Sequence, residues 1–161
     1  MNPRNDGITI VPLTSSRISE LGKLDSVCFS DPWSTESFAS ALENELYTYF
    51  IAVDTTLGNV CGYGGMISVL DSADITNIAV LPDYREKGIG SALLSELISA
   101  AEAKGAFSLH LEVRESNNAA KRLYEKFGFV IDGKRKNYYR RPTEDAILMT
   151  KSLAPNDRKE F

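Results

Sequence analysis

Apolar and polar residues alternate along several short stretches of the chain, and this period of two predicts β-strands. The clearest stretch is 107–114, where Leu109, Leu111 and Val113 share one face. The opposite face then carries Glu112, which keeps its carboxylate out of the core. Similar runs, rich in β-branched and aromatic residues, predict further strands over residues 8–11, 47–53, 60–70, 74–80, 129–132 and 145–150.

Between these runs, apolar residues three and four positions apart predict helices. The longest apolar stripe runs from Ile89 to Ala101, and Gly105 follows it as a C-terminal stop. Shorter stripes predict helices over about 15–28, 35–44 and 118–127.

The segment before residue 35 allows two interpretations. Ser34 can cap the helix predicted over 35–44, with Trp33 and Phe38 packed around the cap as a hydrophobic staple that fixes how the chain enters the helix. Alternatively, the helices on either side of Trp33 form a hairpin that walls a substrate groove.

Strands that alternate with helices over 161 residues indicate a single α/β domain. We expect a mixed, mostly antiparallel central sheet with helices on both faces. The domain is expected to span residues 1–161, with its core over about 8–151 and a polar C-terminal tail over 152–161.

Composition narrows the classes of function. Hydrophobic residues make up 43% of the chain, charged residues 25%, and the net charge of −4 argues against a general nucleic-acid binder. No apolar run reaches the roughly 18 residues that span a membrane, and the N-terminus lacks the apolar stretch of a signal peptide, so we expect a cytoplasmic protein. Cys28 and Cys61 are expected to be reduced core thiols, and His110 is the only histidine, so no metal site is expected.

A glycine-bearing turn links the strand predicted over 74–80 to the longest helix. Residues 85–90 read REKGIG, and the two glycines let a ligand approach the backbone closely. The first N–H groups of a helix carry the positive end of its dipole, so this turn can bind an anion such as a phosphate ester. It has neither the three-glycine dinucleotide fingerprint nor the Gly-Lys-Ser/Thr of a Walker loop. A tight turn without a ligand is the alternative.

Two segments carry a resemblance to a known family. The turn matches Arg-x-x-Gly-x-Gly, and residues 111–129 read LEVRESNNAAKRLYEKFGF. Together with NIAVLPDYREKGIGSALL, DPWS, KNYY and DAILM, these segments resemble the GNAT superfamily of N-acetyltransferases, and within it the RimI-type N-terminal alanine acetyltransferases of ribosomal proteins. The resemblance runs from about residue 29 to residue 149. It implies a GNAT fold in which two central strands, 74–80 and 107–114, splay apart to hold acetyl-CoA.

The resemblance also implies which residues contact acetyl-CoA. The strand beside the pantetheine and acetyl group contributes Ile78, Ala79 and Val80. Near Val80 a splayed or bulged strand is expected to leave an N–H free to meet the oxyanion. Relatives often carry a basic or neutral residue at position 86, so the Glu86 side chain is expected to point outward while its N–H contributes. The remaining implied contacts are the turn residues Arg85, Lys87, Gly88, Ile89, Gly90 and Ser91, and also Asn117.

The same resemblance implies Glu112 as general base and Tyr124 as general acid. A peptide α-amino group has a pKa of about 7.7–8.0 and must lose a proton before it attacks, and the leaving thiolate benefits from a proton or a hydrogen bond. From the pattern alone, Glu112 is a solvent-facing carboxylate and Tyr124 a core aromatic. Tyr138 and Tyr139 resemble the peptide-facing loop of the family and are expected to line the acceptor groove, within a basic stretch, 133–142, expected to be a loop.

The expected function is transfer of acetyl from acetyl-CoA to the α-amino group of an N-terminal alanine, by direct attack in a ternary complex. The resemblance implies a small-subunit ribosomal protein as acceptor, and no metal, nucleic acid or membrane is expected as a partner. The alternatives are an acetyltransferase for a broader set of N-termini, for lysine side chains or for small-molecule amines, and a non-catalytic acetyl-CoA sensor.

Overall fold

The computed structural model describes residues 7–153. Within them the strands are β1 (Ile8–Pro12), β2 (Tyr47–Asp54), β3 (Val60–Val69), β4 (Ser72–Val80), β5 (Ser108–Arg114), β6 (Val130–Tyr139) and β7 (Glu144–Ser152). The α-helices are α1 (Ile18–Cys28), α2 (Thr35–Leu42), α3 (Ile89–Ala103) and α4 (Asn118–Lys126). Short 3₁₀ turns, η2 (Ser15–Arg17) and η3 (Pro82–Tyr84), precede α1 and α3.

These strands form one sheet in the order β1-β2-β3-β4-β5-β7-β6. Every neighbouring pair is antiparallel except β4 and β5, which run parallel. The chain crosses from β4 to β5 through α3, because parallel neighbours need a long crossover connection. The predicted mixed, mostly antiparallel sheet is confirmed.

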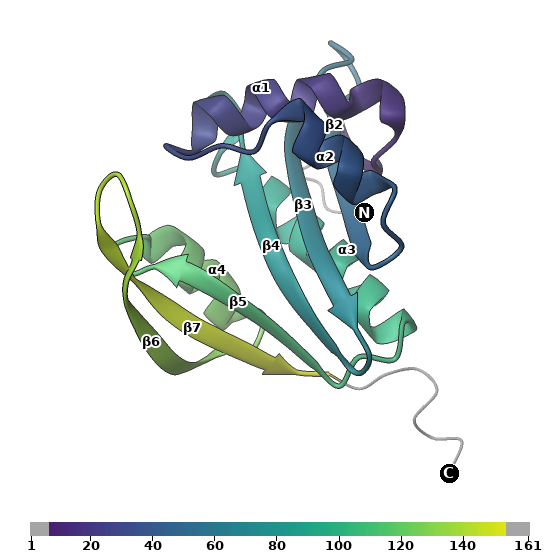
Figure 1. Cartoon of the computed structure of the whole chain (residues 1–161). Coiled ribbons are helices and arrows are strands. Elements are labelled where there is room, and N and C mark those ends of the chain that lie inside the picture. The colour runs from purple at the N-terminus through teal and green to yellow at the C-terminus, as the bar shows by residue number, and fades with distance from the viewer. Residues whose placement is uncertain (1–6, 154–161) are drawn as a thin grey trace.

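The parallel strands β4 and β5 pair only where they begin. Residues 72–74 lie beside residues 108–110, and beyond this point the two strands continue without pairing to each other. Figure 1 shows them diverging from this joint, with β1–β3 on the outer side of β4 and β7 and β6 on the outer side of β5. The predicted splay of these two strands is therefore confirmed.

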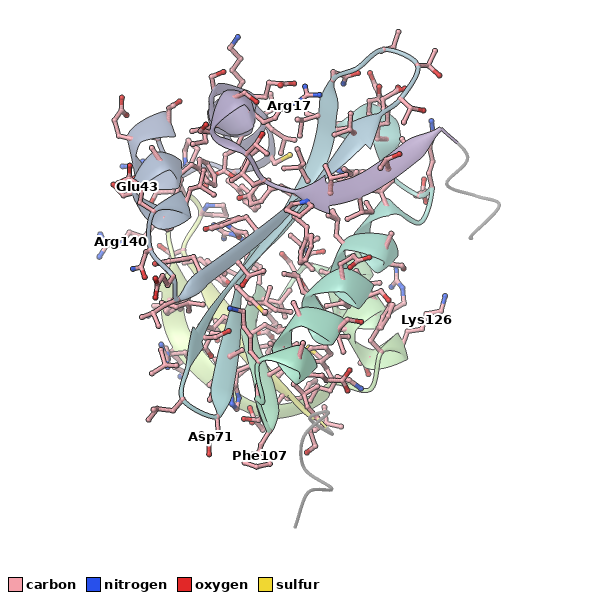
Figure 2. The ribbon with its side chains drawn as sticks, turned by 90° about the vertical axis from the view of Figure 1, so that its right-hand side faces the viewer. Arg17, Glu43, Asp71, Phe107, Lys126 and Arg140 are labelled. Atoms are coloured by element: carbon pink, nitrogen blue, oxygen red, sulfur yellow. The ribbon has the colours of Figure 1, made fainter. Side chains whose placement is uncertain are left out.

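Helices cover both faces of the sheet, as predicted (Figure 2). On one face, α3 packs on β2, β3 and β4 with Leu93, Leu94 and Leu97 completely buried. On the other face, α1 and α2 bury Leu21 and Phe38 against strand residues of β2 and β3. Burial of each such side chain contributes about 1.5–3 kcal/mol relative to exposure, so the two packed faces hold the sheet between them.

Glycines in β3 allow this close packing on both sides. Gly62 and Gly64 face α3, and a Cβ at position 64 would lie 3.0 Å from Cδ1 of Leu97. Gly65 faces the opposite side, where a Cβ would lie 2.2 Å from Cε1 of Tyr49. These three glycines therefore let the β3 backbone lie close to its neighbours on both faces of the sheet.

The segment before α2 forms the predicted staple. The Ser34 hydroxyl accepts a hydrogen bond from the Ser37 N–H at 3.1 Å, so Ser34 is the N-cap. The Trp33 and Phe38 rings lie with their centroids 5.4 Å apart across this cap. Trp33 also lines the cleft described below, so the staple and the groove-wall interpretation are compatible.

The basic stretch 133–142 is mostly strand, and its prediction as a loop is wrong. β6 pairs with β7 from Val130 opposite Thr150 to Tyr139 opposite Glu144, with irregular register along the way. β6 lies at the edge of the sheet, and nearly all of its side chains are exposed. An edge strand with two exposed faces does not show the alternation that marks a half-buried strand, so periodicity could not reveal it.

Two element boundaries differ from the predicted ones. The helix expected from residue 15 begins at Ile18, after the turn η2, and Thr14 makes no capping hydrogen bond through its side chain. At the other end, β7 includes Ser152, and Leu153 is only 5% exposed, although both fall in the stretch expected to be a polar tail. The remainder of that stretch lies outside the described residues.

Candidate active site

A cleft of about 900 Å³ opens between the diverging parts of β4 and β5. Its walls come from these two strands, the start of α4, the connection between α1 and α2, and the hairpin of β6 and β7. The cleft thus brings together side chains from distant parts of the chain. The residues predicted for the site that line it are Ile78, Glu112, Asn117, Tyr124, Tyr138 and Tyr139.

The β4 wall of the cleft contains a β-bulge. Two consecutive residues of β3 pair with Ile75 and Asn77, which leaves Thr76 as the additional residue of β4. The cleft is lined from Ile75 to Ile78, whereas Ala79 and Val80 lie beyond its lining. The sequence predicted the irregular part of this strand near Val80, but it lies near Thr76, four positions earlier. A bulge disrupts the ladder locally and re-aims the backbone groups next to it.

The glycine turn at the end of β4 forms the N-terminus of α3. Gly88 is the N-cap, with φ of 84°, a left-handed conformation that glycine adopts without strain. Glu86 also has positive φ, 63°, and its side chain is exposed. The chain thus bends twice within three residues and presents the start of a 15-residue helix at the end of β4.

The remaining side chains of the turn point to protein partners. Arg85 folds back, and its Nε donates a hydrogen bond to the Val80 carbonyl at 2.9 Å. The Nζ of Lys87 lies 5.6 Å from the centre of the Tyr84 ring. Ile89 is buried and Ser91 half-buried, and a Cβ at position 90 would touch Cδ2 of Leu123 on α4 at 3.5 Å. None of residues 85–91 lines the cleft.

Glu112 faces the cleft from β5. Its neighbours Leu111 and Val113 are buried, and the Glu112 side chain remains 34% exposed. The guanidinium of Arg135 on β6 lies 4.0 Å from its carboxylate. A carboxylate that is reachable from a cleft and held on a rigid strand can accept a proton from an amine bound there.

Tyr124 reaches the same cleft from α4. It is 7% exposed, and its ring meets the Phe129 ring edge-on with centroids 5.6 Å apart. Burial raises the pKa of Tyr124 to about 12, so the phenol stays protonated at neutral pH. It is both the core aromatic that the helical pattern indicates and a hydroxyl at the cleft.

Tyr138 and Tyr139 line the same cleft as Glu112. Their rings meet at right angles with centroids 5.0 Å apart, and the Arg114 guanidinium lies 4.5 Å from the centre of the Tyr139 ring. The pKa of Tyr139 is raised, first by burial and then by the negative charge of Glu112. The Tyr139 phenol is therefore a neutral hydrogen-bonding group at the cleft.

Residues 18–129 match the family model described as Acetyltransferase (GNAT) family. This chain belongs to that family. An Escherichia coli protein named ribosomal protein bS18-alanine N-acetyltransferase is 41% identical over 145 residues, which cover 88% of this chain and 95% of that protein.

Solved structures of acetyltransferases share the fold. The crystal structure of the ribosomal-protein alanine N-acetyltransferase from Escherichia coli matches with a TM-score of 0.85 and 36% identity, over 96% of this chain and 99% of that one. The NatC complex bound to Gag peptide and CoA matches with a TM-score of 0.81 and 26% identity, over 91% of this chain and 99% of that one. The GNAT fold implied by the sequence is confirmed.

Members of the GNAT family use acetyl-CoA as acetyl donor, and this acetyltransferase has features that fit it. Beyond residue 74 one edge of β4 faces the cleft instead of a strand, so an amide-bearing chain such as pantetheine can pair with it. The same strand ends in the glycine turn and the N-terminus of α3, which suits a diphosphate. Asn117 caps α4, because its Oδ1 accepts from the Ala120 N–H at 3.1 Å, and Asn117 also lines the cleft.

One wall of the site of this acetyltransferase was predicted only as an alternative, the hairpin around Trp33, and without most of its residues. The connection between α1 and α2 lines the cleft with Cys28, Phe29, Ser30, Asp31 and Trp33. The sequence assigned both cysteines to the core, which is correct for the fully buried Cys61. Cys28 is only half-buried, and its thiol donates to the Val80 carbonyl at 3.6 Å.

A buried carboxylate fixes this wall. Asp25 is 1% exposed; its Oδ1 accepts from the Tyr63 hydroxyl at 2.5 Å and its Oδ2 from the Trp33 N–H at 2.8 Å. Burial raises the pKa of Asp25, and the two hydrogen bonds oppose that rise. The sequence contained a signal for this group, because Asp25 follows Leu21 by four positions and so takes an apolar place on the α1 stripe.

Residues 7–153 contain no group of three or more His, Cys, Asp or Glu side chains placed to hold a metal ion. None of the helices in this range is long and apolar enough to span a membrane.

Proposed function

We propose that this acetyltransferase moves the acetyl group of acetyl-CoA to the α-amino group of an N-terminal alanine, and that its acceptor is the ribosomal protein bS18. The observation that supports the proposal is the convergence of Glu112 and Tyr124, from different elements, in one cleft beside the open edge of β4. We infer the acceptor from the name of the Escherichia coli relative, which is similar to this chain along most of its length. A ribosomal-protein acceptor also points to the cytoplasm as the place of action.

Glu112 acts as the general base in this proposal. An α-amino group is largely protonated at neutral pH, with a pKa of about 7.7–8.0, and must lose a proton before it becomes a nucleophile. The Glu112 carboxylate removes that proton, directly or through one water molecule. Acetyl-CoA, when bound, supplies the thioester carbonyl that the neutral amine attacks.

Tyr124 stabilises the leaving sulfur. Its phenol is held neutral by burial and can donate a hydrogen bond or a proton to a developing thiolate. Because the pKa of Tyr124 is raised, a hydrogen bond is the larger part of its role. Glu112 thus accepts the proton of the amine and Tyr124 donates a hydrogen bond to the leaving sulfur. The acetyl group passes directly to the amine, and no acyl-enzyme forms.

The proposed contacts with acetyl-CoA come from two parts of the chain, the strand β4 and the turn that follows it. Backbone groups of Ile78, Ala79 and Val80 lie along the pantetheine, and residues 85–91 hold the diphosphate through the start of α3. The exposed Glu86 side chain takes no part. Tyr138 and Tyr139 line the acceptor side of the cleft.

A peptide panel tests the proposal. The enzyme and acetyl-CoA are incubated with peptides that differ only in the first residue, and with an N-terminally blocked peptide that carries an internal lysine. Mass spectrometry is expected to find acetyl on the α-amine of the alanine-first peptide. Acetylation confined to the lysine side chain, or acetylation of no peptide despite binding of acetyl-CoA, would reject the proposal in favour of a different acceptor or a sensor.

A further inference from the structure

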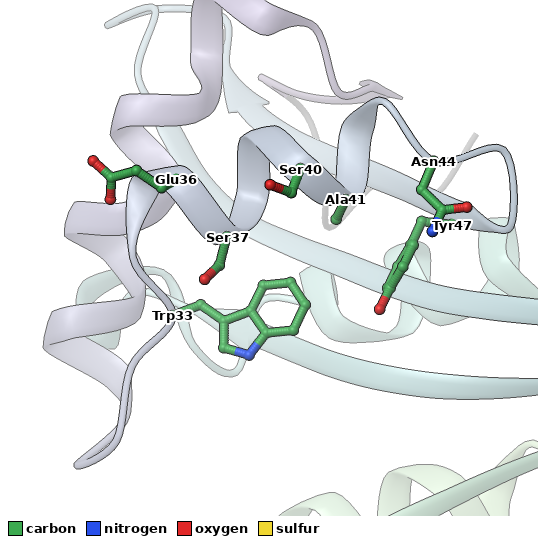
Figure 3. A pocket seen from close by; sticks show the side chains of 7 residues that line it. All are labelled: Trp33, Glu36, Ser37, Ser40, Ala41, Asn44 and Tyr47. Atoms are coloured by element: carbon green, nitrogen blue, oxygen red, sulfur yellow. The ribbon is translucent and has the colours of Figure 1, made fainter.

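A second hollow, of about 420 Å³, adjoins the cleft and shares Trp33 with it. It lies along α2 and the start of β2, and we call it the α2 groove (Figure 3). The residues that line it are Trp33, Glu36, Ser37, Ser40, Ala41, Asn44 and Tyr47. A chain whose first residue lies in the cleft can pass Trp33 and continue directly into this groove.

The lining of the α2 groove suits a cation. Trp33 and Tyr47 present aromatic rings with centroids 6.4 Å apart, and Glu36 lines the groove at the N-terminal end of α2, where its carboxylate points outward, away from the two rings (Figure 3). The remaining polar groups are the hydroxyls of Ser37, Ser40 and Tyr47, the Asn44 amide and the Trp33 indole N–H, and the lining contains no Lys, Arg or His. Aromatic faces and a carboxylate together attract an ammonium or guanidinium group, and the hydroxyl and amide oxygens can accept its hydrogen bonds.

The groove is also rigidly built. The Trp33 backbone is held by the buried Asp25, and its ring packs against Phe38. Tyr47 stacks on Tyr49 with centroids 6.0 Å apart and planes 12° from parallel. A binding surface held in place before the ligand arrives loses little conformational entropy on binding.

We propose that the α2 groove binds a lysine or arginine side chain of the acceptor, a few residues beyond the alanine that is acetylated. This inference rests on the proposed function and adds a second recognition element to it. A ribosomal protein binds a polyanion, so a cationic segment close to its N-terminus is chemically reasonable. The enzyme would then select its acceptor by charge as well as by the first residue.

Matched peptides measure this selection. Two alanine-first peptides differ only in carrying lysine or glutamine at each of positions three to six, one position at a time. The wild-type enzyme is expected to favour lysine at one or two of these positions by about threefold to tenfold in kcat/KM, the range that an exposed cation–aromatic contact and a surface ion pair provide. The preference should shrink as salt concentration rises, because exposed charges are screened.

Two isosteric variants separate the groove from the net negative charge of the protein. Glu36 and Glu43 lie at opposite ends of α2, both are exposed, and only Glu36 lines the groove. Glu36→Gln is expected to reduce the lysine-to-glutamine ratio of kcat/KM to the part that the aromatic rings provide, and Glu36→Lys to abolish or invert it. Glu43→Gln removes the same charge and should keep the wild-type ratio.

The possible outcomes separate this inference from the proposed function. Failure to acetylate any alanine-first peptide rejects the proposed function itself. Acetylation with equal efficiency for lysine and glutamine peptides keeps that function and overturns the groove. An equal loss of the ratio in Glu36→Gln and Glu43→Gln also overturns it, since the selection would then come from the general charge of the surface. The peptide comparison on the wild-type protein decides even where a variant folds poorly.

Discussion

The buried pair of Asp25 and Tyr63 offers a sharp test of the architecture. Tyr63→Phe removes one hydroxyl and leaves the ring, which is completely buried and packs edge-on against Phe38 with centroids 5.4 Å apart. The Asp25 carboxylate then retains only the Trp33 N–H among the donors described above. The variant therefore isolates one hydrogen bond to a buried charge.

The magnitude follows from the environment. A hydrogen bond to a charged group contributes about 1.5–3 kcal/mol, and a buried acceptor that loses its donor keeps the cost of its removal from water. We expect Tyr63→Phe to lower the free energy of unfolding by about 2–4 kcal/mol. For a domain of this size, each kcal/mol lowers Tm by about 2–4 °C, so the midpoint should fall by about 4–16 °C.

A second tyrosine in the same chain provides the control. Tyr84 donates to the Asp54 carboxylate at 2.7 Å, which is the same chemical bond in a more exposed position. Tyr84→Phe should cost far less, because water can replace the hydroxyl there. Both variants are compared by urea unfolding and by calorimetry. Equal losses for the two would refute the argument, since burial is the only feature on which it predicts a difference.

The pH dependence gives an independent check. Burial raises the pKa of Asp25 in the folded protein, so the stability that this group contributes is greatest in acid and is lost as pH rises through the raised pKa. The Tyr63 hydroxyl opposes the rise, and Tyr63→Phe should push the pKa of Asp25 still higher. The stability difference between wild type and variant should therefore be largest near neutral pH and shrink on acidification. A difference that grows in acid would contradict the assignment.

Three further predictions concern the site and its support. Glu112→Gln should lower kcat by about 10²–10⁴-fold and leave acetyl-CoA affinity nearly intact, and an unchanged kcat would remove Glu112 as base. The control Glu125→Gln, an exposed change on α4, should change neither kcat nor acetyl-CoA affinity. Gly88→Val should weaken acetyl-CoA binding by about tenfold or more in calorimetric titration, and Gly58→Val, with nearly the same φ of 80° and no neighbour within 4 Å, should leave it unchanged. Gly65→Ala should destabilise the fold by about 1–3 kcal/mol in thermal unfolding, because its Cβ would lie 2.2 Å from the Tyr49 ring; wild-type stability would show that the ring moves freely.

Local signals predicted the elements that position the chemistry. The alternation over 107–114 placed Glu112 opposite the buried face of β5, and the Ser34 cap and the glycine turn that opens α3 were both visible as short motifs. Such features depend on a few neighbouring residues, so a sequence can show them directly. The roles of Glu112 and Tyr124 came from family resemblance, since a strand carboxylate and a stripe tyrosine are otherwise ordinary.

Features that depend on contacts between distant segments were missed or misplaced. The bulge of β4 was expected near Val80 and lies at Thr76, because it arises from the register of β3 against β4 and no local signal in β4 marks its position. β6 is a strand because β7 pairs with it, despite its exposed and basic side chains. The wall built by Asp25 and Trp33 requires Tyr63, which is 38 residues away from Asp25 along the chain. The sequence offered the groove wall around Trp33 as an alternative, and the role of Asp25 in it was marked only by the position of an aspartate on an apolar stripe.

The parallel pair explains why the site lies where it does. Because β4 and β5 run in the same direction, the helices that follow them, α3 and α4, both begin at the same end of the sheet, where the strands have separated. The two sides of the cleft therefore contribute different groups to the site. The side of β4 holds the open strand edge, the glycine turn and the Trp33 wall, and the side of β5 holds Glu112 and Tyr124.

The angle between these two sides therefore sets the distance between donor, acceptor and base. It is held by the short pairing of residues 72–74 with 108–110, by the hydrogen bond from the Phe107 N–H to the Asp71 carbonyl at 2.6 Å, and by one apolar cluster that includes Ile75 of β4 and Leu111 of β5. Figure 2 shows Asp71 and Phe107 together at this joint, at the far end from α1. Reacting atoms must be aligned to within a fraction of an ångström, so a small rotation at the joint moves Glu112 relative to anything bound along β4. The catalytic geometry of this acetyltransferase is thus a property of the joint as much as of the residues in the cleft.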